Sequence, residues 1–99
     1  MSETKLADQA ARGEDAKRIL EHPLVNEAFE SIRQTCIDAW ENSRGEDTEV
    51  RQNAYLMQRL LRNLREQFTL QIANGKHAEK ELLELSKPRT KIRRLSNHG

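Results

Sequence analysis

Apolar residues recur at helical spacing along most of the chain, and the pattern is strongest between residues 48 and 73. The intervals there are four, three, four, three and four residues, which keeps these side chains on one face of an α-helix. The series consists of Val50, Ala54, Met57, Leu61, Leu64 and Phe68, and Ile72 extends it. The pattern predicts one amphipathic helix over residues 48–73.

A second apolar series predicts a helix over residues 23–42. Its members are Val25, Phe29, Ile32, Cys36 and Ala39, with Leu24, Ala28, Ile37 and Trp40 widening the stripe. Pro23 suits the first turn of this helix, because that turn needs no amide donor, and proline biases His22 away from helical angles. A shorter helix over residues 4–21, weakened by Gly13, is therefore expected to end before Pro23.

The segment SRGED, residues 43–47, separates the two strongest patterns. Gly45 tolerates left-handed backbone angles, and Asp47 or Thr48 can accept the first free amides of the next helix. A connection this short makes consecutive helices antiparallel neighbours. We therefore expect a helical hairpin whose two apolar stripes face one another.

The pair Asn74-Gly75 predicts the end of the third helix, because both residues tolerate the left-handed conformation that terminates helices. A fourth helix over residues 76–86, with Ala78, Leu82 and Leu85, then either folds back over the hairpin or continues the third helix past a kink. The expected fold class is all-α. It comprises one domain over residues 1–86, an antiparallel hairpin with short flanking helices, and a basic disordered tail over residues 87–99.

Composition agrees with solvated helices and limits the size of the core. The chain has 99 residues, of which 33% are charged and 4% aromatic, and so short a chain buries a small fraction of its surface. Residues 1–86 hold 12 Lys and Arg against 16 Asp and Glu, a net charge of −4, whereas residues 87–99 hold five basic residues and no acid. The sequence thus predicts an acidic body with a basic tail.

The third predicted helix carries arginines beside its apolar stripe. At 100° per residue, Arg51, Arg59, Arg62 and Arg65 form an arc centred about 120° from the stripe. One interpretation is a surface that follows nucleic-acid phosphates, together with Lys87, Arg89, Lys91, Arg93 and Arg94 of the tail. The favoured interpretation is a solvated face whose arginines pair with acids of the preceding helix, namely Glu27, Glu30, Asp38 and Glu41.

The third helix also has more apolar width than one partner helix should cover. Leu56 and Leu60 lie beyond the main arc, and Trp40 lies near the end of the second helix, where a lid over the core is the favoured interpretation. Either the first and last helices cover this surface or another subunit does. We expect self-association through Leu56, Leu60 and Trp40, because burying a leucine contributes roughly 1.5–3 kcal/mol.

Residues for catalysis, cofactors or metals do not form a recognisable constellation. His22, His77 and His98 belong to no metal-binding motif, and His77 with Glu81 predicts a solvated pair one turn apart. Cys36 occupies a stripe position and should be a buried, unreactive thiol in a reducing cytosol. The sequence therefore predicts no enzyme, no cofactor and no small-molecule substrate. It contains no signal-peptide-like run and no apolar stretch long enough to span a membrane.

Several segments resemble short uncharacterised proteins encoded by tailed bacteriophages and prophages, often near genes for head assembly and DNA packaging. They are AKRILEHPLVNEAFESIRQTCIDAWENS, DTEVRQNAYLMQRLLRNLREQ and NGK, within residues 16–80. The resemblance implies a small phage protein in the cytoplasm of a bacterial host, or in the virion, and it assigns no catalytic residue.

Two hypotheses of function follow from these patterns. The first is a non-enzymatic assembly or packaging accessory that acts through helix–helix self-association or by binding a phage assembly protein. The alternative is a nucleic-acid-binding protein, such as a small packaging subunit or a regulator, that uses the arginine-flanked helix and the basic tail.

Overall fold

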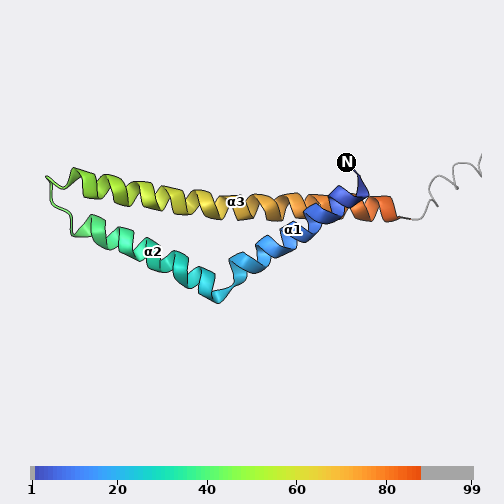
Figure 1. The fold of residues 1–99 in the computed structure, drawn as a ribbon, viewed down its shortest axis with the longest axis horizontal. Coiled ribbons are helices and arrows are strands. Elements are labelled where there is room, and N and C mark those ends of the chain that lie inside the picture. Colours follow the sequence, from blue (N-terminus) through green and yellow to red (C-terminus); the bar gives the residue numbers. More distant parts are fainter. Residues whose placement is uncertain (1, 88–99) are drawn as a thin grey trace, which may run out of the picture.

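The computed structural model describes residues 2–87, and three helices account for nearly all of them. These are α1 (Glu3–Glu21), α2 (Pro23–Glu41) and α3 (Thr48–Ser86) (Figure 1). No strand occurs within residues 2–87. The predicted all-α class is confirmed, and the boundaries of α1 and α2 lie within one residue of the expected ranges.

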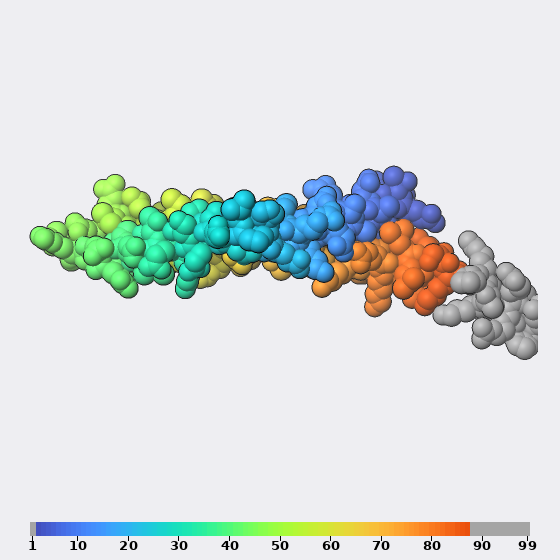
Figure 2. Space-filling model, turned by 90° about the horizontal axis from the view of Figure 1, so that it is seen from below, coloured from blue at the N-terminus to red at the C-terminus, as the bar shows by residue number. Residues whose placement is uncertain are grey.

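The long helix α3 supports the other two. It has 39 residues, which corresponds to about 58 Å at 1.5 Å per residue. The chain runs back along it, with α2 beside the first half of α3 and α1 beside the second half (Figure 1). The molecule measures 80 × 24 × 19 Å along its principal axes, and its slender outline is plain in Figure 2. The described body is therefore two helices thick along its length.

The predicted break at Asn74-Gly75 was wrong, because α3 passes through both residues as one helix. The third helix does not end at residue 73, and residues 76–86 form no separate helix. The alternative that this segment continues the third helix is the correct one. No glycine within the described range has a positive φ, so neither Gly75 nor Gly45 adopts the left-handed conformation expected of it.

Gly75 serves instead as the point where α1 crosses α3. A Cβ atom built on Gly75 would lie 2.7 Å from the Cα of Gly13 and 3.1 Å from the carbonyl oxygen of Gln9. A Cβ atom on Gly13 would lie 2.7 Å from the Cα of Gly75. Both glycines are buried. The two backbones therefore approach more closely than any residue with a side chain would allow.

The apolar stripe of α3 continues through Gly75 in an unbroken seven-residue register. Leu61, Phe68, Gly75 and Leu82 are spaced by seven, and so are Val50, Met57, Leu64, Gln71, Ala78 and Leu85. Such a repeat keeps one face of a helix directed at its neighbours. It also explains why residues 76–86 extend α3 rather than forming a fourth helix.

The junction between α1 and α2 is held by His22 and Asn26. The Nδ1 atom of His22 accepts a hydrogen bond from the amide of Leu24 at 3.1 Å, so this side chain caps α2. The side-chain amide of Asn26 donates to the carbonyl oxygen of Leu20 at 2.8 Å and to that of His22 at 3.1 Å. The prediction that Pro23 begins a new helix is confirmed, and the chain turns sharply there (Figure 1).

The core is thin, as the chain length predicts. Its buried hydrophobic residues within the described range are Leu6, Ala16, Phe29, Cys36, Ala54 and Ala78. The predicted stripes meet only in part, because Ile32 of α2 and Val50, Met57 and Leu64 of α3 are exposed. A two-helix layer covers one side of each stripe and leaves the other side open. Over residues 2–87, no helix combines the length and the apolar character needed to cross a membrane.

Candidate interaction surfaces

The structure divides the four arginines of α3 into two groups. Arg51 donates from its guanidinium to the carbonyl oxygen of Gly45 at 3.0 Å and also to that of Arg44. The guanidinium carbon of Arg65 lies 4.9 Å from the centroid of the Phe29 ring, a cation–π distance. Arg51 therefore braces the loop between α2 and α3, and Arg65 packs on α2. Only Arg59 and Arg62 of this set are left as exposed candidates for a partner.

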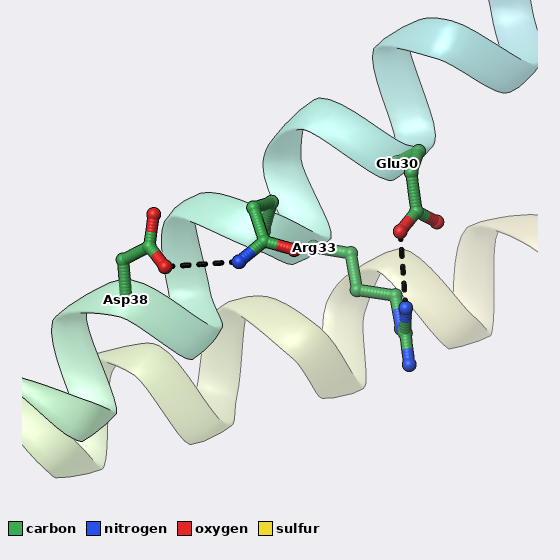
Figure 3. Close-up of polar contacts among 4 residues, drawn as sticks. Glu30, Arg33 and Asp38 are labelled. Atoms are coloured by element: carbon green, nitrogen blue, oxygen red, sulfur yellow. Dashed lines mark hydrogen bonds and ion pairs between the residues drawn. The ribbon is translucent and has the colours of Figure 1, made fainter.

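The expected ion pairs between the α3 arginines and the acids of α2 do not form within the described residues. Glu30 instead accepts from Arg33 at 3.1 Å, and Asp38 accepts from the side-chain amide of Gln34 at 2.9 Å. Figure 3 shows both contacts running along α2 rather than across to α3. The solvated-face interpretation therefore needs correction in its partners, because the acids of α2 bond within their own helix.

A groove follows one flank of the α2–α3 pair and contains Arg59 and Arg62. Its volume is about 740 Å³. It is lined by Cys36, Ile37, Trp40 and Glu41 of α2 and by Ala54, Tyr55, Gln58, Arg59, Arg62, Asn63 and Glu66 of α3. Two aromatic rings, two guanidinium groups and two carboxylates share this surface. The arginine analysis missed Tyr55 and Glu66, since only the packing of α2 on α3 places them beside Trp40.

Trp40 is not a lid over the core. Its side chain is 51% exposed and forms part of the groove, and Tyr55 across the groove is 55% exposed. The buried residue at this level of α2 is Cys36, as predicted. The indole faces the groove because Trp40 follows Cys36 by four residues, which turns it about 40° away from the buried line.

The apolar surplus predicted on α3 is present and uncovered. Leu56 is 54% exposed and Leu60 is 64% exposed. The alternative that the first and last helices cover this surface is wrong, because α1 packs on the other half of α3 and residues 76–86 extend α3 away from it. Trp40 does not join these leucines, since it belongs to the groove. The three residues predicted as one surface thus lie on two different sides of the molecule.

The described region offers no metal site. No cluster of three or more His, Cys, Asp or Glu side chains suited to a metal occurs within residues 2–87. The Nε2 atom of His77 lies 2.7 Å from a carboxylate oxygen of Glu81, and both side chains face solvent, as predicted. Of the tail residues predicted to contact nucleic acid, Lys87 pairs with Glu84 at 3.0 Å. Arg89, Lys91, Arg93 and Arg94 lie outside the described residues.

Comparison of the chain with protein-family models, with curated proteins and with solved structures found no match. The resemblance to phage proteins therefore stays a prediction from the sequence, and the surfaces described above are the basis for inferring function.

Proposed function

We propose that this protein is a non-enzymatic assembly module that works by helix–helix association, first of all with further copies of itself. The observation that carries the proposal is the number of large apolar side chains exposed on a body only two helices thick. In the half formed by α2 and α3 they include Leu24, Ile32, Val50, Leu56, Met57, Leu60 and Leu64. Apolar patches of this extent are typical of association surfaces.

Energetics support association of the chain with another helical surface. Burying a large aliphatic side chain contributes roughly 1.5–3 kcal/mol, and the side chains in question are about half exposed. A partner that covers several of them recovers a free energy comparable to the whole stability of a small domain, about 5–15 kcal/mol. We infer that the folded chain alone leaves a substantial part of its available burial unused. An assembly or packaging accessory of a phage is the setting that the sequence resemblance suggests.

The absolute mass of the wild-type chain in solution tests this proposal. Size-exclusion chromatography with light scattering, over a hundredfold range of concentration, should give a multiple of 11.5 kDa that dissociates on dilution. A chain that stays at 11.5 kDa throughout this range would argue against self-association.

A second candidate function is the binding of single-stranded nucleic acid in the groove. The observation in its favour is that Arg59 and Arg62 lie beside Trp40 and Tyr55, since stacking aromatics and cations together form sequence-tolerant sites. Glu41 and Glu66 in the same groove weaken its attraction for phosphate. This arrangement ranks second because the two carboxylates offset the two guanidinium groups.

Fluorescence of Trp40 provides a direct test of this candidate. An oligonucleotide that stacks in the groove should quench the indole, and the effect should weaken steeply as salt is raised. The Arg59→Ala/Arg62→Ala variant should lose the effect, whereas Arg12→Ala/Arg18→Ala on α1 removes the same charge and should keep it. No quenching at low salt would exclude the groove as a nucleic-acid site.

A further inference from the structure

The two flanks of the α2–α3 pair differ in chemical character. The groove flank carries the charged and aromatic side chains described above. At 100° per residue from the buried Ala54, Arg62 and Tyr55 turn about 80° and 100° to one side, whereas Met57, Leu64 and Leu60 turn about 60°, 80° and 120° to the other. All three of the latter are exposed. The side of α3 opposite the groove is therefore an apolar flank.

The neighbouring helix presents the same character on that side. Measured from the buried Cys36, Ile32 and Leu24 of α2 turn about 40° and 120° away from the groove, and both are exposed. The residues at intermediate angles on α2 are Ala28, Thr35 and Ala39, and those on α3 include Val50, Asn53 and Gln67. No charged residue occupies any of these positions, although one third of the chain is charged. We name this surface the uncharged flank and define it by Leu24, Ile32, Val50, Met57, Leu60 and Leu64.

The second half of α3 indicates what such a flank is suited to contact. The seven-residue series that begins at Val50, Met57 and Leu64 continues to Ala78, which is fully buried. It is buried in the half of α3 that packs against α1, next to the Gly13–Gly75 crossing. One side of a single helix is thus covered by a helix along its second half and uncovered along its first half. The missing neighbour is a helical surface, and none of residues 2–87 supplies it.

We propose that the uncharged flank is the homodimer interface and that its occupant is the same flank of a second copy. A surface without charge is complementary to itself, so a twofold axis brings no like charges together. Two helices from each copy then form a four-helix bundle, which is a standard way to bury the open side of a helical pair. This inference rests on the proposed function, because it assigns self-association to one face.

The interface area supports a bundle of four helices rather than a contact between two. A stable dimer buries about 1,200–2,000 Å² in total. Eighteen residues of helix are about 27 Å long, and two helices side by side are about 20 Å wide, so the flank has a plan area of roughly 540 Å² per copy. A pair of such faces approaches the lower limit of a stable interface. A contact through α3 alone offers half of this area and falls short.

Matched charge insertions on the two flanks test the proposal. Leu60→Glu places a carboxylate on the uncharged flank, and Tyr55→Glu places one on the groove flank at a residue of similar exposure. In light scattering, Leu60→Glu should reduce the mass of the dimer to 11.5 kDa and weaken association at least a hundredfold, while Tyr55→Glu should keep the dimer. Circular dichroism should give equal helix content for both variants, since both side chains are exposed in the monomer.

Trp40 gives an independent readout, because it lies on the groove flank. Its quenching by acrylamide should be the same in the dimer and in the Leu60→Glu monomer. A dimer that survives Leu60→Glu, that is lost with Tyr55→Glu, or that protects Trp40 would overturn the assignment of the face while leaving self-association intact. A wild-type chain that is monomeric at every concentration would overturn both proposals.

Discussion

Gly13 and Gly75 lie against one another where α1 crosses α3, with room for no Cβ atom on either residue. Replacing Gly75 with alanine should destabilise the fold although alanine favours helix by about 1 kcal/mol. The added methyl would meet the Gly13 backbone, which cannot rotate away, so we expect a net loss of about 1–3 kcal/mol. Urea denaturation followed by circular dichroism measures this difference.

Gly45→Ala is the control for this substitution. A Cβ atom on Gly45 would meet nothing within 4 Å, and no described glycine has a positive φ. Gly45→Ala should therefore be neutral or stabilise by up to about 1 kcal/mol. If Gly75→Ala were as harmless as Gly45→Ala, the close approach of the two backbones would be disproved.

Asn26 should stabilise the turn between α1 and α2 by satisfying the carbonyl at the end of α1. Asn26→Ala removes the hydrogen bonds to the carbonyl oxygens of Leu20 and His22. We expect a loss of about 1 kcal/mol and faster amide exchange in the last turn of α1. Gln34→Ala, which removes an exposed side-chain contact to Asp38, should change stability by only a few tenths of a kcal/mol. Equal effects of the two substitutions would contradict a special role for Asn26.

Arg51 should order the loop over residues 42–47. Arg51→Ala removes the donors to the carbonyl oxygens of Arg44 and Gly45, so the loop amides should exchange faster and proteases should cut there more readily. The expected loss of stability is about 1 kcal/mol. Arg59→Ala carries the same change of charge on a side chain directed into the groove and should leave the loop unaffected. Protection that is unchanged in Arg51→Ala would contradict the bracing role.

Cys36 and Trp40 should differ sharply in accessibility although they are one helical turn apart. Cys36 is buried, so a thiol reagent should modify it only as the chain unfolds, with a rate that follows the free energy of opening. Trp40 is half-exposed, so acrylamide should quench it readily in the native state. Rapid labelling of Cys36 without denaturant, or an indole shielded in the monomer, would contradict the packing of α2 on α3.

The sequence alone predicted the features that depend on local chemistry. The spacing of apolar residues located α1, α2 and the first part of α3, and the fixed φ of Pro23 with the restriction on His22 located the junction. Burial of Cys36 and exposure of Leu56 and Leu60 also followed from their positions relative to the stripes. These features were accessible because helical periodicity and proline geometry act within a few residues along the chain.

The tertiary structure decided the features that depend on which surfaces meet. Gly75 favours helix termination in isolation, yet the approach of Gly13 from a helix sixty residues away makes its lack of a side chain a packing requirement. The seven-residue register through Gly75 was the signal in the sequence that could have revealed the continuous helix. Likewise, only the packing of α2 on α3 separates Trp40 from Leu60 and occupies Arg51 and Arg65. Periodicity shows which residues share a face, whereas the partner of that face depends on contacts between distant segments.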